Sequence, residues 1–304
     1  MKLNTILQAL KLLEGYGNKK VFQLISKLEL LSKNELSEIE FIKKIKNYNL
    51  TTASNPIDIE NVRNKLSLSS RIDEQNEQNE IASISIFDKE YPNQLRDLAS
   101  PPLLLYYRGN KQCLIGEPGI AIIGSRKASE LSLDFAFKSA LGIGKKGITV
   151  VSGLALGCDT AAHKGTLAGN GKTVAVLAGG IDNDTIYPKG NLQLAHNIIE
   201  KQGCLVSEYP SGTPVAPYTF IERDRIQSGL SHTLLVIQTT IDGGSMQTYK
   251  FAVDQKRRVA CFNTEGVEAE YSGNAKILEN INTIPINIEK DLEKILTRQP
   301  NSLF

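Results

Sequence analysis

The chain has 304 residues, which predicts about two domains, and its 41% hydrophobic and 22% charged residues are typical of a globular protein. A formal net charge of +2 does not by itself indicate or exclude nucleic-acid binding, because local basic groups can bind phosphates on a near-neutral chain. No apolar run approaches the ~20 residues that span a bilayer, and no signal peptide is recognisable. We therefore expect a cytoplasmic protein without membrane association.

Cysteine and histidine usage argues against metal or disulfide chemistry. The four cysteines show no paired spacing, and the chain has three histidines. Neither a Gly-x-Gly-x-x-Gly sequence nor a Gly-Lys-Ser/Thr sequence follows the first core strand, so dinucleotide and P-loop sites are not indicated. We expect no metal and no cofactor.

The N-terminal residues 1–70 are predicted to form a small helical domain of helix-hairpin-helix or SAM-like type. Apolar side chains recur at helical spacing over residues 6–13 and again over residues 21–28. Between them, Gly15-Tyr16-Gly17-Asn18-Lys19-Lys20 resembles a helix-hairpin-helix turn, which aims backbone N–H groups at a phosphate. A plain turn between two helices is the alternative, because short Gly-x-Gly turns are common.

Residues 71–90 are expected to join this domain to a larger core. Residues 73–80 are acidic and rich in Asn and Gln, which predicts a linker or an exposed loop, and residues 84–87 predict a strand that leads into the core. The core is expected over residues 91–288, and residues 289–304 form a C-terminal tail.

The core alternates short apolar runs with longer amphipathic segments. Continuous apolar runs are typical of strands covered on both faces, and intervals of 27 to 29 residues between successive glycine turns suit strand–helix units. This pattern predicts an α/β fold of Rossmann-like, doubly wound type with a mostly parallel sheet. The expected strands are Ile120–Ile123, Thr149–Ser152, Thr173–Leu177, Leu205–Ser207, Leu234–Ile237 and Val259–Phe262.

Glycine-rich turns follow three of these strands. Gly124-Ser125-Arg126 combines a glycine that admits a ligand, a hydroxyl, and an arginine that can bind phosphate with two N–H groups. Gly153 follows the second strand, and Gly244-Ser245-Met246 opens a helix after a later one. Because the carboxyl ends of parallel strands lie at one edge of the sheet, we expect these turns to form an anion site there.

Further basic and aromatic residues are candidates for the same site. Lys189, with Asn191, lies at a helix start, where a cation is unfavourable unless an anion is near. Phe220 precedes Arg223 and Arg225, which at a loop-to-helix junction could both reach one anionic groove. A solvated lysine and a charged helix with internal ion pairs are the alternatives.

One pair could in principle carry catalysis. Asp159 with His163 four residues later would be an acid–base or metal pair, although a helix cap at Asp159 and a structural His163 are favoured. No other acid, base or nucleophile adjoins the glycine-rich turns, so we expect no catalytic residue.

In their joint order, these motifs resemble the DNA-processing protein A family (DprA, also called Smf) over roughly residues 88–280. Two positions depart from the family pattern: Arg-Asn-Arg is Arg223-Asp224-Arg225 here, and Ser-Gly-Ser is Gly243-Gly244-Ser245. The matching elements are Tyr91-Pro92, Pro101-Pro102, Gly109-Asn110, Gly124-Ser125-Arg126, Ser152-Gly153-Leu154-Ala155 with Asp159, Ala162-His163, Tyr187-Pro188 with Asn191, Ser207-Glu208, Arg223-x-Arg225 and Gly244-Ser245-Met246.

The resemblance implies a dimeric, non-enzymatic protein that protects incoming single-stranded DNA and loads the RecA recombinase in natural transformation. Two alternatives stay open: a LOG-like nucleoside monophosphate phosphoribohydrolase, and a defence-associated relative that senses nucleotides. The expected DNA-binding residues are Gly124, Ser125, Arg126, Gly153, Lys189, Asn191, Phe220, Arg223, Arg225, Gly244, Ser245 and Met246.

Overall fold

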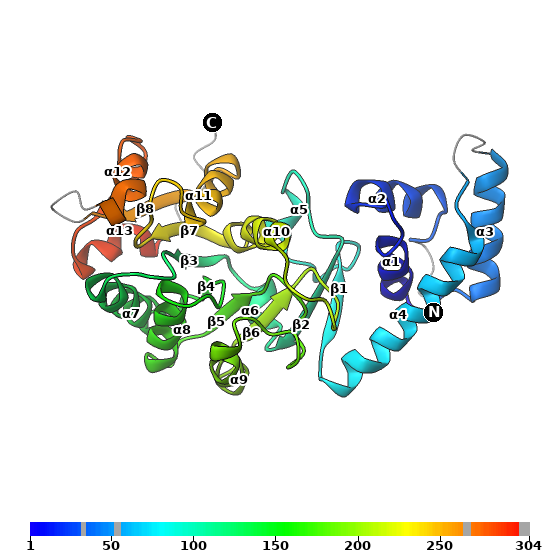
Figure 1. The fold of residues 1–304 in the computed structure, drawn as a ribbon, viewed down its shortest axis with the longest axis horizontal. Helices are drawn as coiled ribbons and strands as arrows, with labels where there is room; N and C mark the ends of the chain where they lie inside the picture. Colours follow the sequence, from blue (N-terminus) through cyan, green and yellow to red (C-terminus); the bar gives the residue numbers. More distant parts are fainter. Residues whose placement is uncertain (32–34, 52–55, 264–268, 298–304) are drawn as a thin grey trace. The chain divides into compact units, whose positions relative to one another are not determined.

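The computed structural model describes residues 1–31, 35–51, 56–263 and 269–297. Contacts divide the chain into two compact units (Figure 1). Unit 1 comprises Met1–Tyr91 and Ala99–Tyr106, and unit 2 comprises Pro92–Leu98 and Tyr107–Phe304.

Unit 1 is built mainly from helices, as the apolar spacing predicts. Helix α1 packs against α4, where the Thr5 hydroxyl donates a hydrogen bond to Asp73 over 2.6 Å and the Gln8 amide donates to the Ser69 carbonyl over 3.2 Å. The elements are α1 (Leu3–Lys11), α2 (Asn18–Lys27), α3 (Glu38–Thr51), α4 (Ile59–Gln78), β1 (Ala82–Ser85) and the first part of β2 (Leu104–Gly109).

The linker predicted for residues 73–80 is wrong, because α4 continues to Gln78. Asp58 caps the helix by accepting hydrogen bonds from the backbone N–H groups of Glu60 and Asn61. Polar composition hid the helical period: the buried positions recur every three or four residues, at Val62, Leu66, Ser69, Ile72 and Asn76. The strand expected over residues 84–87 is present as β1, which begins and ends two residues earlier, at Ala82–Ser85.

Unit 2 contains the predicted Rossmann-like, doubly wound α/β sheet. Seven of its strands lie in the order β6-β5-β4-β3-β7-β8-β9, and every neighbouring pair is parallel. All six expected strands are confirmed, and β9 is an addition. Their bounds are β3 (Gly119–Ile123), β4 (Val150–Ser152), β5 (Thr173–Val176), β6 (Cys204–Ser207), β7 (Ser231–Val236), β8 (Arg258–Phe262) and β9 (Ile284–Ile286).

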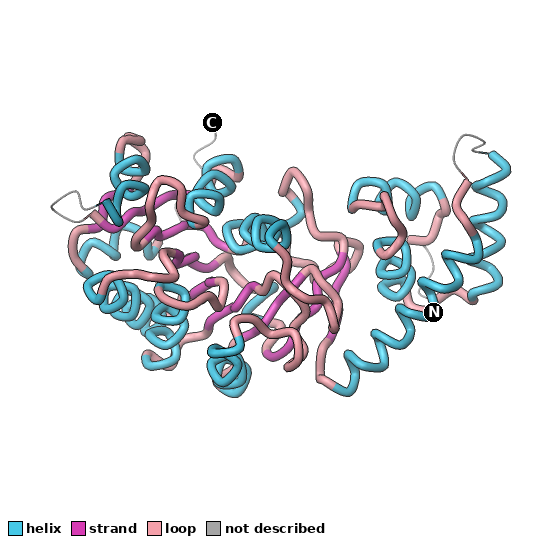
Figure 2. The backbone as a smooth tube through the Cα atoms, in the orientation of Figure 1, coloured by secondary structure: helices cyan, strands magenta, loops and turns pink. Residues whose placement is uncertain are grey.

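Helices cover both faces of this sheet (Figures 1 and 2). Helices α7 (Glu130–Lys145), α8 (Cys158–Ala168) and α9 (Leu192–Glu200) lie on one face, and α10 (Pro217–Gly229) and α11 (Ser245–Asp254) lie on the other. Shorter elements complete the unit: α5 (Asn93–Arg96), α6 (Gln112–Ile115), η1 (Lys189–Asn191), η2 (Ala269–Tyr271), α12 (Ser272–Leu278), η3 (Glu289–Leu292) and α13 (Glu293–Leu296).

A hydrophobic core lies between the sheet and the helices of the first face. The Phe135 ring of α7 stacks on Phe262 of β8 with centroids 3.9 Å apart. Leu292 and Ile295, from the segment predicted as a tail, are buried in the same core. Apolar side chains at helical spacing therefore draw the described part of this segment into unit 2, and residues 298–304 lie outside the described residues.

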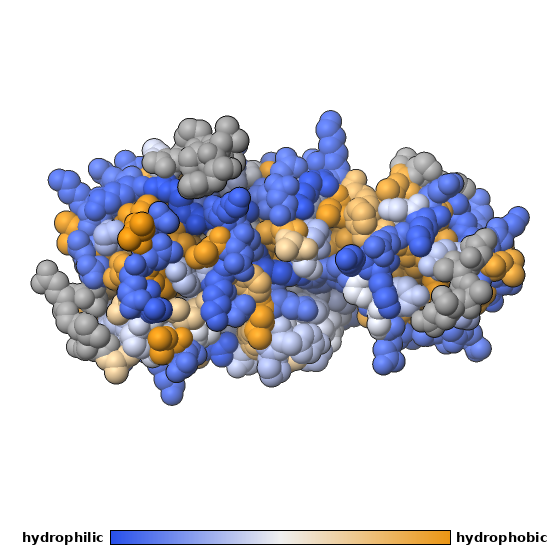
Figure 3. Space-filling view, turned by 90° about the horizontal axis from the view of Figure 1, so that it is seen from above, coloured by the Kyte–Doolittle hydropathy of each residue, from blue (hydrophilic) through white to orange (hydrophobic). Residues whose placement is uncertain are grey.

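The visible surface is mostly hydrophilic. Figure 3 shows one face on which hydrophobic side chains appear in small separate groups, as is common for globular domains. In the part of the chain that the structure describes, no helix is long and apolar enough to cross a membrane.

The strand order reverses at β3. From β3 the chain proceeds outward through β4, β5 and β6, and then returns to pair β7 with the opposite side of β3. In open parallel sheets such a switch point leaves a crevice at the carboxyl ends of the two strands, where ligands bind.

The packing of α7 on α8 is tight enough to predict a matched pair of substitutions. A Cβ atom at Gly165 of α8 would overlap with the carbonyl oxygen of Phe137 in α7, so we expect Gly165→Ala to lower the free energy of unfolding by about 1–3 kcal/mol. Gly142 of α7 has open space around its Cβ position, so Gly142→Ala should be neutral or stabilising by up to about 1 kcal/mol. Urea denaturation of both variants checks this, and equal effects would contradict the close packing.

Candidate functional site

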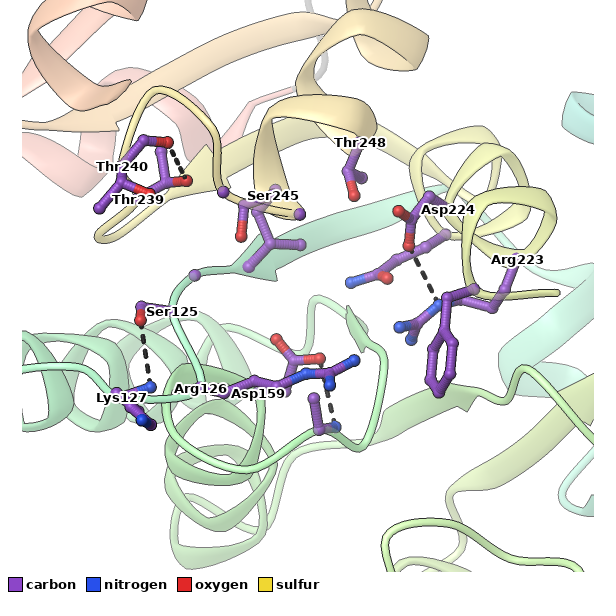
Figure 4. A pocket seen from close by; sticks show the side chains of 17 residues that line it. Ser125, Arg126, Lys127, Asp159, Arg223, Asp224, Thr239, Thr240, Ser245 and Thr248 are labelled. Carbon is purple, nitrogen blue, oxygen red and sulfur yellow. Dashed lines mark hydrogen bonds and ion pairs between the residues drawn. The ribbon is translucent and has the colours of Figure 1, made fainter. Parts of the chain in front are cut away.

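A cavity of about 510 Å³ lies at the carboxyl ends of β3 and β7 (Figure 4). It is formed by the loop after β3, the loop between β4 and α8, one face of α10, and the segment from β7 into α11. Its lining residues are Ile123, Gly124, Ser125, Arg126, Lys127, Ala155, Asp159, Phe220, Arg223, Asp224, Gln227, Thr239, Thr240, Gly243, Gly244, Ser245 and Thr248.

The loop after β3 is fixed by backbone hydrogen bonds. The N–H of Ser125 donates to the Gln238 carbonyl over 2.7 Å, and the Ser125 carbonyl accepts from the N–H of Cys158 over 3.2 Å. A Cβ atom at Gly124 would lie 2.5 Å from the Cys158 sulfur, so only glycine fits this approach. The Arg126 guanidinium lies over the Phe220 ring, 5.1 Å from its centroid, in cation–π geometry.

Arg223 is a buried cation at the centre of the site, with 7% of its surface exposed. Its Nη1 donates to the Val176 carbonyl over 2.9 Å, and its Nε lies 3.1 Å from Oδ1 of Asp224. A Cβ atom at Gly153 would overlap with the guanidinium. The absence of a side chain at Gly153 therefore lets the Arg223 guanidinium lie directly against the backbone of the β4–α8 loop.

Asp159 fixes the same loop from the other side. Its Oδ2 accepts from the N–H of Gly153 over 3.0 Å and from the N–H of Ala155 over 3.3 Å. Burial raises the pKa of Asp159, while the charge of Arg223 and these backbone bonds oppose the rise. The predicted helix cap is wrong, because Gly157 is the N-cap of α8 and Asp159 bonds to the preceding loop.

His163 does not pair with Asp159. Its ring is fully buried, and its Nδ1 lies 2.8 Å from the Thr173 hydroxyl. Burial, followed by the charge of Arg223, lowers the pKa of His163 to about 3, so the ring is neutral at pH 7. Among the described residues, no group of three or more His, Cys, Asp or Glu side chains is placed to hold a metal ion.

Asp224 places a carboxylate in the pocket wall. Burial, with a smaller contribution from the nearby Asp159, raises its pKa to about 6 against the charge of Arg223. A hydrogen bond with Thr248 and the charge of Arg126 lower it. The carboxylate is therefore mostly ionised at pH 7, inside a pocket that also carries two arginines.

The start of helix α11 forms the opposite wall. Gly244 is its N-cap and makes no side-chain capping bond. The N–H groups of Met246 and Gln247 donate to the carbonyls of Gly243 and Gly244, each over 3.0 Å, while the helix dipole favours an anion at this end. The predicted anion site at the Gly243-Gly244-Ser245 turn stays a prediction.

The structure brings together seven of the twelve sequence-predicted site residues. These line the cavity: Gly124, Ser125, Arg126, Phe220, Arg223, Gly244 and Ser245. Gly153 lies against Arg223, as described above, although it is not part of the lining.

Three other predicted residues have structural partners. The Lys189 ammonium donates to the carbonyls of Asn183 and Asp184 over 3.2 and 2.6 Å. The Asn191 amide donates to the Leu154 carbonyl over 2.8 Å, and so holds the β4–α8 loop. Met246 is buried in the first turn of α11. None of these three lines the cavity.

Arg225 does not share the groove of Arg223. It forms an ion pair with the buried carboxylate of Glu208 and does not line the cavity. The expectation that both arginines reach one groove assumed a loop-to-helix junction, whereas both lie inside α10. Residues two apart on a helix point to different faces, which separates the two side chains.

Sequence reasoning missed five polar residues of the lining, and one of them, Lys127, directly follows the predicted Gly124-Ser125-Arg126 turn. Thr239 and Thr240 follow a correctly expected strand, so they lie at its carboxyl end and could have been found from that position. Gln227 lies one turn after Arg223, and Thr248 lies three residues after Ser245, so both required the helix register to be known.

Comparison with known proteins identifies the family. The model of the DNA recombination-mediator protein A family matches residues 82–296. The chain belongs to this family. Protein Smf of Synechocystis is 34% identical over 227 residues, covering 69% of this chain and 56% of that protein. DNA processing protein DprA of Bacillus subtilis is 36% identical over 179 residues, covering 59% of each chain, so the matches span little more than half of these relatives.

Solved structures agree with the fold. DNA processing protein A of Streptococcus pneumoniae has a TM-score of 0.77 and 26% identity, covering 97% of this chain and 98% of that one. The protein of that name from Helicobacter pylori has a TM-score of 0.63 and 24% identity, covering 71% and 95%.

The raised pKa of Asp224 predicts a pH dependence of stability. Since the folded state holds this proton more tightly than the unfolded state, with a pKa of about 6 against 3.8, its stabilising contribution is present at low pH and is lost as pH rises through about 6. Between pH 5 and 7.5 the loss is on the order of 1 kcal/mol, or a few degrees of melting temperature. Asp224→Asn should remove it, which melting curves at both pH values measure.

A control variant is available in the same unit. A hydrogen bond from Lys294 lowers the pKa of Asp291 to about 2, so Asp291 is ionised throughout this range. Asp291→Asn should leave the difference in melting temperature between pH 5 and 7.5 unchanged. An unchanged difference in Asp224→Asn as well would show that Asp224 does not titrate near pH 6.

Proposed function

We propose that this protein binds single-stranded DNA at the cavity between β3 and α11. One observation supports this most directly: the Arg126 guanidinium lies over the Phe220 ring beside a glycine-rich turn and a helix N-terminus. Cationic groups, backbone N–H donors and an aromatic face together suit a flexible strand, whose phosphates and unstacked bases are both accessible.

The aromatic surface continues beyond the cavity. The Tyr187 ring meets Phe220 edge-on with centroids 6.0 Å apart, and 46% of Tyr187 is exposed. Exposed aromatic rings beside a phosphate site provide stacking positions for successive bases. Duplex DNA has its bases already stacked, so this arrangement favours single strands.

Family membership extends the proposal. The Helicobacter pylori protein of this fold is described as binding single-stranded DNA. For this chain we propose the same ligand, without enzymatic turnover, and a cytoplasmic role in natural transformation as a homodimer that protects DNA and loads RecA. The alternatives of a phosphoribohydrolase and a nucleotide sensor receive no support from the comparisons.

The first test of this proposal is the loss of a cation. Arg126→Ala should weaken binding of a labelled thymidine 20-mer by about fivefold to tenfold and flatten its salt dependence, because one phosphate contact is removed. Lys138→Ala removes the same charge from an exposed position on α7, outside the cavity lining, and should leave affinity nearly unchanged. Fluorescence anisotropy at two salt concentrations measures both. Equal affinity of the parent protein for duplex and single-stranded DNA would refute the proposal.

A second test displaces Arg223 without removing it. The atom that a Cβ at Gly153 would overlap is the end of a flexible side chain, so Gly153→Ala should fold while it moves the guanidinium out of place. We expect a DNA affinity at least fivefold lower and a lower melting temperature, because the buried guanidinium loses its contacts with Val176 and Asp224. Circular dichroism checks that the variant is folded at the temperature of the binding assay. Gly142→Ala on α7 places its new methyl group in open space outside the cavity lining and serves as the control. Undiminished affinity in Gly153→Ala would show that the position of Arg223 is not needed for binding.

A further inference from the structure

One end of the cavity carries polar groups that a phosphate does not explain. Gln227 is 1% exposed and lines the cavity, and its side-chain amide nitrogen has no hydrogen-bond partner among the described residues. Buried amide donors are almost always bonded, because an unmet donor loses its water without compensation. An amide donor left unmet in a cavity wall indicates a ligand atom that accepts a hydrogen bond there.

The neighbouring Asp224 selects the kind of ligand. Its carboxylate is negative and lies beside Arg223 in the same wall, with Thr248 bonded to it. A phosphate placed against a carboxylate would meet like charge. This end therefore suits a neutral group that has N–H donors for Asp224 and an acceptor for Gln227.

The size of the cavity leaves room for such a group. About 510 Å³ is the volume of a small-molecule site rather than of a single phosphate. Anion-binding groups lie in the same lining, at Gly124-Ser125-Arg126 and at the start of α11. The cavity thus combines groups that suit a phosphate with groups that suit a hydrogen-bonding base, as a nucleotide requires.

The two side chains are adjacent on one helix face. Asp224 and Gln227 lie three residues apart on α10, a spacing that makes helical side chains neighbours. A carboxylate beside an amide donor matches guanine best, because guanine offers two adjacent N–H donors, N1–H and the 2-amino group, next to the acceptor O6. Adenine, cytosine and thymine each offer only one donor group on that edge.

We propose that Asp224 and Gln227 recognise the base of a guanine nucleotide whose phosphate lies at the Gly124-Ser125-Arg126 turn. The inference rests on the proposed function, because single-stranded DNA is the source of the guanine nucleotide that we propose. A free guanine nucleotide carries the same chemistry, and the experiment separates the two sources.

The test compares bases that differ by single groups. Fluorescence anisotropy is measured with thymidine 20-mers that contain five separated guanines, five hypoxanthines, which lack the 2-amino group, or five adenines. We expect the guanine strand to bind about tenfold more tightly than the hypoxanthine strand, since a hydrogen bond to a carboxylate is lost. In Asp224→Asn this ratio should fall below about threefold. Gln227→Leu removes the donor to O6, which hypoxanthine shares and adenine lacks, so it should instead reduce the preference for the guanine strand over the adenine strand. Glu222→Gln, an exposed change on the same helix that is absent from the lining, should retain it.

The outcomes distinguish this inference from the proposed function. Binding of all strands with equal affinity overturns guanine recognition and leaves single-stranded DNA binding intact. A guanine preference that persists in both variants, when their melting temperatures show that they are folded, assigns recognition to other residues and also overturns it.

Competition by deoxyguanosine monophosphate identifies the source. Displacement of the guanine strand by this nucleotide, but not by deoxyinosine monophosphate, supports recognition of an isolated nucleotide. Guanine preference without such displacement supports recognition within a strand. Binding of the monophosphate by a protein that binds no strand would support the inference while refuting the proposed function.

Discussion

The site depends on one buried cation, the guanidinium of Arg223. It connects three segments: it bonds to the carbonyl of Val176 at the end of β5, contacts Asp224 on its own helix, and lies against the backbone at Gly153. Burying a charge costs free energy unless the charge is paired and hydrogen-bonded. Losing the bond to Val176 or the contact with Asp224 would therefore destabilise the folded protein. Asp159 adds a second carboxylate. It accepts hydrogen bonds from the β4–α8 loop, against which the Arg223 side chain packs.

This arrangement limits how the pocket can attract an anion. Its lining has three cations, Arg126, Lys127 and Arg223, against two carboxylates, Asp159 and Asp224, which leaves a balance of only +1 when both acids are ionised. The phosphate binding that we propose therefore relies on oriented groups more than on excess charge: the glycine-rich turn after β3, the helix dipole at the start of α11, and the Arg126 guanidinium over Phe220. A chain with a net charge of +2 can hold such a site.

The sequence predicted the strands and turns around this site better than the directions of the side chains in it. Continuous apolar runs located β3 to β8, and the carboxyl ends of parallel strands must share an edge. Side-chain direction was not predictable in the same way. Helix α10 carries charged or polar residues around its circumference, so no apolar stripe revealed that Arg223 and Arg225 lie in one continuous helix and face apart. The continuation of α4 through residues 71–78 was missed for a similar reason, since its buried face includes Ser69 and Asn76.

The Arg-x-Arg motif does not predict which of its two arginines lies beside the cavity. Both are buried arginines in one short sequence, and each has a carboxylate partner. The partner of Arg225, Glu208, comes from a different segment and leaves the guanidinium outside the cavity lining. The partner of Arg223 lies in the cavity wall itself, which keeps that guanidinium beside the ligand space. The position of the acid partner thus decides whether each arginine lies beside the cavity, and the binding role that we propose for Arg223 depends on it.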